Sequence, residues 1–192
     1  MTELRIPGLA DVPGVYRVCF ETAGMDAAAN PDLVGHVYAG PYVARHPDLS
    51  QVVVDDHGVA GYVFGCPDTL AFEAWCDENW WPSLRRQYPV GSGNTVDAEM
   101  IGLLHTPPTT PPAVLDEHPA HLHIDLLPRT QGHGYGRVLI EWLCGELAER
   151  GVPGVHLGVG STNSNAIAFY EHLGFVTLED DGDTRFMARR LG

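Results

Sequence analysis

A glycine-rich turn, Gln131-Gly132-His133-Gly134-Tyr135-Gly136, is the feature that most constrains this chain. It follows an apolar run at residues 121–127 and precedes a segment with helical periodicity at residues 134–150. A strand, a glycine-rich turn and a helix in this order predict an anion site. Glycines let backbone N–H groups approach a ligand, and the N-terminus of the helix adds a favourable dipole. The turn therefore predicts a phosphate-bearing ligand.

Two common phosphate-binding motifs do not fit this turn. Dinucleotide binding needs GxGxxG and an acidic residue about 20 positions later, whereas this turn is GxGxG. The apolar run at residues 155–159 is followed by Gly160-Ser161-Thr162, which supplies no acid for a ribose. A P-loop needs Lys followed by Ser or Thr, and that pair is missing. A dinucleotide-dependent oxidoreductase is therefore only a distant alternative.

The rest of the pattern predicts an α/β fold. Strands are expected at residues 4–6, 51–55, 59–65, 100–104, 120–127, 155–159, 175–178 and 184–189. Helices are expected at residues 11–22, 33–37, 70–88, 134–150 and 163–173. The strand–helix–strand unit at residues 120–159 implies a parallel or mixed sheet. Residues 67–119 read as a long aromatic-rich insert, and residues 1–192 are expected to form a single domain.

Composition limits the possible partners. The chain has 192 residues, 44% hydrophobic and 19% charged, which predicts a substantial core. A net charge of −14 without basic patches predicts no nucleic-acid partner. No apolar run approaches the ~20 residues of a membrane span, and no secretory signal is visible. Four scattered cysteines indicate reduced thiols in the cytoplasm, and no histidine or cysteine pair predicts a metal site.

A second motif indicates which kind of phosphate-bearing ligand the turn is expected to bind. Residues 163–175 read NSNAIAFYEHLGF, some thirty residues after the turn. In this order and separation, the two elements resemble the GNAT family of acetyl-CoA-dependent N-acetyltransferases. The resemblance covers roughly residues 122–175. It implies a GNAT-like, mixed and mostly antiparallel central sheet flanked by helices, with the insert before the cofactor-binding strand and acetyl-CoA as co-substrate.

The resemblance assigns roles to individual residues. The backbone of the turn would bind the pyrophosphate, and residues 124–126 would hold the pantetheine arm. Asn163 would contact the CoA arm, and Tyr170 would protonate the departing thiolate. Arg137 is either an extra cation beside the phosphates or a solvated helix residue. The expected cofactor-binding residues are Ile124, Asp125, Leu126, Gln131, Gly132, His133, Gly134, Tyr135, Gly136, Arg137, Asn163, Ala166 and Tyr170.

A closer resemblance rests on less specific features. Gly61-Tyr62-Val63-Phe64-Gly65, the aromatic stretch at residues 68–89 and the strand at residues 121–126 look like the acetyltransferase-like C-terminal domain of O-GlcNAcases. In the animal members the glycine turn is degenerate, whereas here it is intact. The chain also has no room for a glycosidase domain. We therefore expect a free-standing bacterial relative.

The expected catalytic residues are Tyr170, Asp125 and His123. Asp125 and His123 lie two residues apart on one face of the strand, where a carboxylate between apolar neighbours indicates a general base or a structural hydrogen-bond acceptor. A backbone N–H near Leu126 would stabilise the oxyanion. Trp81 and Tyr88 are expected to line the acceptor pocket, since tryptophan faces attract cations, although the insert aromatics could instead form a core.

The expected function is transfer of acetyl from acetyl-CoA to a primary amine: a small amine, an amino sugar or a lysine side chain. The alternative is a non-catalytic acetyl-CoA-binding sensor or a pseudo-acetyltransferase that acts as an interaction module. The acceptor would be a small molecule or a protein, with no nucleic-acid or membrane partner. The protein is expected to be a monomer or a homodimer.

Overall fold

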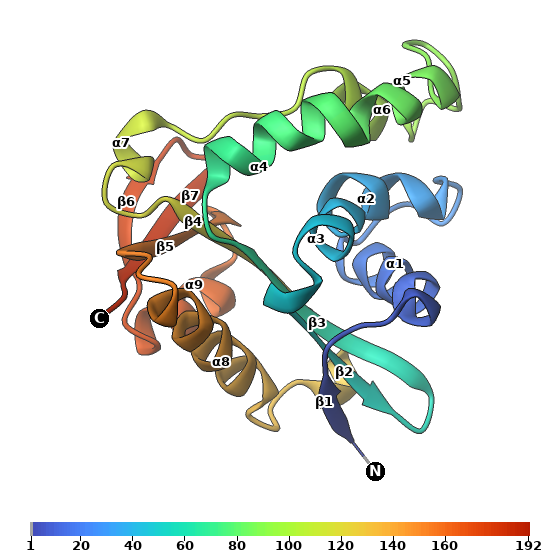
Figure 1. Cartoon of the computed structure of the whole chain (residues 1–192). Coiled ribbons are helices and arrows are strands. Elements are labelled where there is room, and N and C mark those ends of the chain that lie inside the picture. The colour runs from blue at the N-terminus through green and yellow to red at the C-terminus, as the bar shows by residue number, and fades with distance from the viewer. Residues whose placement is uncertain (1) are drawn as a thin grey trace.

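The protein is built on one seven-stranded sheet, seen in a computed structural model that describes residues 2–192 (Figure 1). The strand order is β1-β2-β3-β4-β5-β7-β6. Every neighbouring pair is antiparallel except β4 and β5, which are parallel. The strands are β1 Glu3–Arg5, β2 Ser50–Asp55, β3 Gly58–Cys66, β4 Ala120–Leu126, β5 Gly154–Gly160, β6 Val176–Asp180 and β7 Thr184–Arg190. This confirms the mixed, mostly antiparallel sheet.

Helices cover both faces of the sheet (Figure 1). They are α1 Val12–Thr22, α2 Pro31–Tyr38, α3 Gly40–Arg45, α4 Thr69–Trp75, α5 Trp81–Gln87, α6 Ala98–His105, α7 Pro112–Leu115, α8 Tyr135–Glu149 and α9 Ser164–His172. Short 3-10 turns span Leu9–Asp11, Pro47–Leu49 and Pro128–Thr130. Within residues 2–192, no helix is both long and apolar enough to cross a membrane.

The sheet separates two hydrophobic cores. Successive side chains of β3 alternate between them: Tyr62 and Phe64 join the core with α1–α6, whereas Val63 joins the core beneath α8 and α9. Leu139 and Leu143 of α8 are fully buried in this second core. The apolar face of helix α8 therefore packs against one face of strand β3.

The strand predicted at residues 100–104 is wrong, because this segment lies within α6. A short apolar run fits either a buried strand or a buried helix, and periodicity alone does not distinguish them. Met100, Ile101 and Leu104 recur at helical spacing and are buried in the core shared with α2 and α5. Tertiary packing therefore decides the conformation of this segment.

The insert at residues 67–119 contains α4 to α7 and adds most of its aromatic side chains to the first core. Phe72 and Trp81 are buried there, and Trp75 and Trp80 pack against it. The helix expected at residues 70–88 is interrupted by a π turn, Cys76–Trp80, before α5 begins. Pro82 lies in the first turn of α5, where its missing N–H needs no helical partner.

A buried hydrogen-bond network joins α3, α4 and β4 at His121. The Thr69 hydroxyl donates to the carbonyl of Pro119 at 2.7 Å and lies 2.8 Å from His121 Nδ1. Because that hydroxyl has one proton, Nδ1 must donate to it, and Nε2 must accept the proton of Tyr42 Oη at 2.6 Å. Burial holds the pKa of His121 well below its ordinary value, so the ring is neutral.

This network predicts an effect of Tyr42→Phe on stability. Loss of the hydroxyl leaves buried Nε2 of His121 with only the weak thiol of Cys66 at 3.7 Å, which should reduce the free energy of unfolding by about 1–3 kcal/mol. Urea denaturation measures the change. Tyr38→Phe is the matched control, because the Tyr38 hydroxyl bonds to no other described residue, and its effect should stay within about 0.5 kcal/mol. Equal effects of both substitutions would contradict the proposed proton arrangement.

Candidate active site

The site begins where β4 and β5 diverge. The two strands pair only at Ala120↔Val155 and His121↔His156. The opposite edge of β4 pairs with β3, and the N–H of Leu127 donates to the carbonyl of Ala60 at 2.9 Å. Since hydrogen-bonding directions alternate along a strand, the N–H groups of Ile124 and Leu126 face the edge that β5 has left. The divergence therefore exposes backbone donors of β4 to a ligand.

A cleft of about 910 Å³ follows this open edge. It is lined by β4, the glycine turn, the start of α8, β5 and α9. Its size suits a small-molecule site. Every expected cofactor-binding residue lines it except His133, whose side chain is exposed outside the cleft. The structure thus brings residues 124–126, the turn, Asn163, Ala166 and Tyr170 together.

The glycine turn has the backbone conformation that an anion cradle requires. Gly132 and Gly134 adopt φ values of 74° and 83°, which side-chain-bearing residues rarely adopt. Gly134 caps α8 without a side-chain hydrogen bond, so no side chain covers the first N–H groups of this helix. The Gln131 amide donates to the carbonyl of Leu126 at 2.8 Å and fixes the turn against β4. An anion at the start of α8 would meet these N–H groups directly.

Gly136 of the turn and Arg137 after it line the cleft at the start of α8. Gly136 allows close packing, since a Cβ there would lie 3.0 Å from Cζ of Phe169. Arg137 is exposed on the cleft and forms no ion pair within 4.0 Å with another described residue. Its charge is therefore available to a bound anion.

The start of α9 completes the far side of the cleft. Asn163 caps this helix, because its Oδ1 accepts the N–H of Ala166 at 3.2 Å. The amide NH₂ of Asn163 keeps its two donors for another partner. One residue of α9, Tyr170, is 9% exposed, and its hydroxyl bonds to no other described residue. Burial raises the pKa of that hydroxyl, so it holds its proton at neutral pH.

Asp125 lines the same cleft, and its carboxylate already accepts a hydrogen bond. Tyr62 Oη donates to it at 2.5 Å from the adjacent strand. Burial raises the pKa of Asp125 to about 6, an effect that the hydrogen bond from Tyr62 partly offsets. The carboxylate is therefore mostly ionised at neutral pH but costly to bury.

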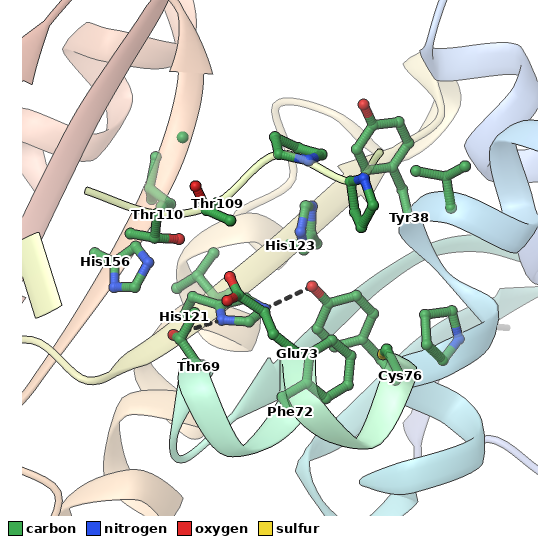
Figure 2. A pocket seen from close by; sticks show the side chains of 18 of the residues that line it. Tyr38, Thr69, Phe72, Glu73, Cys76, Thr109, Thr110, His121, His123 and His156 are labelled. Carbon is green, nitrogen blue, oxygen red and sulfur yellow. Dashed lines mark hydrogen bonds between the residues drawn. The ribbon is translucent and has the colours of Figure 1, made fainter. Parts of the chain in front are cut away.

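His123 lies between the cleft and a second cavity of about 420 Å³. Figure 2 shows its ring between Tyr38 and the His121 network. Burial lowers the pKa of His123 to about 4, and its ring nitrogens bond to no other described residue. Six residues line both cavities: Leu122, His123, Leu157, Gly158, Val159 and Gly160. The imidazole is thus a neutral acceptor at their junction.

The two predicted pocket aromatics lie in different places. Trp81 lines the second cavity, whereas Tyr88 lines neither cavity and packs beside His36 with a ring separation of 5.9 Å. Sequence reasoning missed Glu21 and Thr22 of the cleft, and Tyr38, Glu73 and the strap at residues 107–110 of the second cavity. No local motif marks these residues, because packing of distant segments places them. Within residues 2–192, no group of three or more His, Cys, Asp or Glu could hold a metal ion.

Comparison with known proteins identifies the family. The family model described as "Acetyltransferase (GNAT) family" matches residues 21–175. The chain belongs to this family. The curated relatives that it matches are named as acetyltransferases, and the chain spans less than half of their length. It is 47% identical over 62 residues to the [ribosomal protein bS18]-alanine N-acetyltransferase of Escherichia coli K12, which is 32% of this chain and 41% of that protein.

Other relatives extend the match. A mycothiol acetyltransferase from Nocardioides sp. is 46% identical over 59 residues, 31% of this GNAT chain and 20% of that protein. The crystal structure of SsHAT covers 100% of this chain and 98% of its own, at 36% identity and a TM-score of 0.90. A Sinorhizobium meliloti phosphinothricin acetyltransferase, solved in complex with acetyl-CoA, shares the fold at 18% identity and a TM-score of 0.59. It covers 100% of this chain and 89% of its own.

The burial of Asp125 predicts how stability depends on pH. The pKa of Asp125 is about 6 in the folded protein against 3.8 for a free carboxyl, so folding favours the protonated form. Its contribution should fall by about 2–2.5 kcal/mol as the pH rises from about 4 to about 7. Urea unfolding of wild type and Asp125→Asn at both pH values isolates this group. The stability difference between the two proteins should change with pH, and a constant difference would contradict the raised pKa.

Proposed function

We propose that this protein transfers the acetyl group of acetyl-CoA to a primary amine. Acetyl-CoA is the co-substrate. The observation that carries the proposal is the arrangement along one cleft of the glycine turn, the open edge of β4 and the protonated hydroxyl of Tyr170. A phosphate cradle at one end and a proton donor at the other suit a long thioester substrate.

Backbone groups of this chain would bind most of the co-substrate. The N–H groups of the turn and of the first residues of α8 would hold the pyrophosphate, with Arg137 as an exposed cation. The N–H groups of Ile124 and Leu126 would pair with the amides of the pantetheine arm. The free NH₂ of Asn163 would donate to the same arm. The gap between the diverging strands β4 and β5 would thus direct the thioester towards Tyr170 and His123.

Three groups would then perform acyl transfer. His123 takes a proton from the acceptor nitrogen as the new N–C bond forms. A backbone N–H near Leu126 stabilises the oxyanion. Tyr170 donates its proton to the sulfur as the C–S bond breaks, which releases CoA as a thiol. Each proton therefore has a named donor and acceptor in this chain.

His123 suits the role of base better than Asp125. Its nitrogens have no hydrogen-bond partner among residues 2–192, and it is the one of the two that lines both cavities. Asp125 already accepts the Tyr62 hydroxyl and does not line the second cavity. We therefore assign Asp125 a positioning role: it holds the β3–β4 surface beside the cleft and does not touch the acceptor.

Several finer expectations belong to this proposal. They are the relationship to the acetyltransferase-like domain of O-GlcNAcases, one domain over residues 1–192, a cytoplasmic location, and a monomer or homodimer. The strong acidity and scattered cysteines support the location. The long insert before β4 supports the relationship. The non-catalytic sensor remains the second candidate, because a histidine with a pKa of about 4 is a weak base.

Tyr170→Phe tests the proposed acid. The substitution removes the proton donor but keeps the ring, so kcat should fall by about 10²-fold or more while the Kd for acetyl-CoA is unchanged. Thiol release over a panel of amines measures kcat, and calorimetry measures the Kd. Tyr88→Phe is the matched control, because Tyr88 lies outside both cavities, and its kcat should equal that of wild type. An unchanged kcat in Tyr170→Phe would exclude Tyr170 as the acid. Acetyl-CoA binding without turnover of any amine would favour the sensor.

The choice between the two bases predicts a pH profile. A base with a pKa of about 4 stays neutral over most of the working range. The kcat profiles of wild type and Asp125→Asn should therefore have the same shape between about pH 5 and pH 8. Ionisation of the amine affects both proteins equally and cancels in this comparison. A wild-type limb near pH 6 that Asp125→Asn removes would transfer the role of base to Asp125.

A further inference from the structure

The second cavity adjoins the proposed reaction point. It has a volume of about 420 Å³ and lies between β4, β5, α2–α5 and the strap at residues 107–110 (Figure 2). It opens into the cleft at His123 and at residues 157–160 of β5. A molecule in this cavity would reach the thioester from the side opposite the glycine turn. The cavity is thus a candidate site for the acceptor.

Its walls are apolar and aromatic. Tyr38 of α2, Phe72 of α4 and Trp81 of α5 line it, together with Pro107 and Pro108 of the strap. Figure 2 shows Phe72 and Tyr38 flanking the space in which His123 lies. Such walls favour an apolar chain, and the aromatic faces tolerate a cation.

One carboxylate in this cavity has no cationic partner. Glu73 of α4 is half-buried, and it forms no ion pair within 4.0 Å in the described part of the chain. The backbone of Thr110 hydrogen-bonds to it, and burial raises the pKa of Glu73. The other lining carboxylate, Asp77, already pairs with Arg85 at 3.0 Å. Among residues 2–192, no lysine or arginine lines the cavity.

The histidines of the cavity do not supply the missing positive charge. His121 and His123 are held neutral by burial. His156 lies with Nδ1 2.7 Å from the carbonyl of His118, and burial lowers its pKa also. The cavity therefore holds one carboxyl group without a cationic partner within its aromatic walls. A bound cation would favour the ionised form of this carboxyl group and pair with it.

The unpaired carboxylate and the reaction point are separate. Glu73 lines only the second cavity, whereas His123 lines both. A cation paired with Glu73 lies within the second cavity, whereas a nitrogen that attacks the thioester lies where this cavity meets the cleft. An acceptor with two nitrogens joined by an apolar segment fits both positions.

We propose that the acceptor is a compact diamine, with one ammonium group bound by Glu73 and the other nitrogen acetylated beside His123. This rests on the proposed function above. Phe72 and Trp81 pack against the carbon chain between the two nitrogens. A lysine side chain or a simple alkylamine offers one nitrogen and leaves Glu73 unpaired. Glu73 is a specificity residue in this account and has no part in the proton transfers.

The test compares unbranched alkanediamines with alkylamines of the same chain length. Wild type should acetylate its best diamine with a kcat/KM about 10- to 100-fold higher than that of the matched monoamine, the range expected for a charge-assisted contact. Glu73→Gln should remove this preference by raising KM for the diamine. Thiol release measures both constants.

Controls separate this proposal from the proposed function. Glu78→Gln changes an exposed carboxylate outside both cavities and should keep the preference. Calorimetry with acetyl-CoA, and then with diamine in the presence of CoA, is run on each protein. If acetyl-CoA binds but no diamine binds or is preferred, or if Glu73→Gln keeps the preference, the diamine assignment is overturned and the proposed function stands. If acetyl-CoA does not bind, both fail.

Discussion

The divergence of β4 from β5 is the constraint on which the rest of the site depends. Two paired positions, Ala120↔Val155 and His121↔His156, hold the strands together. Beyond them, one edge of β4 is free while β3 keeps the other in register. The same divergence opens the cleft that reaches the glycine turn and the passage at His123 to the second cavity. A fully paired sheet would close both.

Backbone groups determine the chemistry of the cleft, whereas side chains determine the chemistry of the second cavity. In the cleft, backbone N–H groups are free to meet a ligand, because glycines with positive φ and a helix start without a side-chain cap leave them uncovered. In the second cavity, side chains of the insert supply aromatic walls and one unpaired carboxylate, Glu73. Burial keeps His123 neutral between them. In the proposed mechanism, the common framework binds the phosphates and the insert selects the acceptor.

The parts of the candidate site that could be predicted from the sequence lie in contiguous segments. The turn, α8 and the Asn163–Tyr170 motif depend on glycine, capping and helical period, which are local properties. Residues 100–104 were misread because a short apolar run carries no decisive period. Trp81 and Tyr88 looked equivalent, but the π turn at Cys76–Trp80 changes the helical phase, and Tyr88 lies outside the cavities. Glu73 reaches the strap only through tertiary packing, which no local pattern reports.

The proposed mechanism depends on acetyl-CoA binding by the glycine turn at the start of α8. Calorimetric titration of wild type, Gly134→Ala and Gly145→Ala with acetyl-CoA tests it most directly. Gly134 has φ +83°, so a methyl group there strains the turn, and the affinity should fall about tenfold or more. Gly145 lies within α8 with open space around it, so its variant should bind as wild type does. Equal affinities of Gly134→Ala and wild type, or no binding by wild type, would contradict the account.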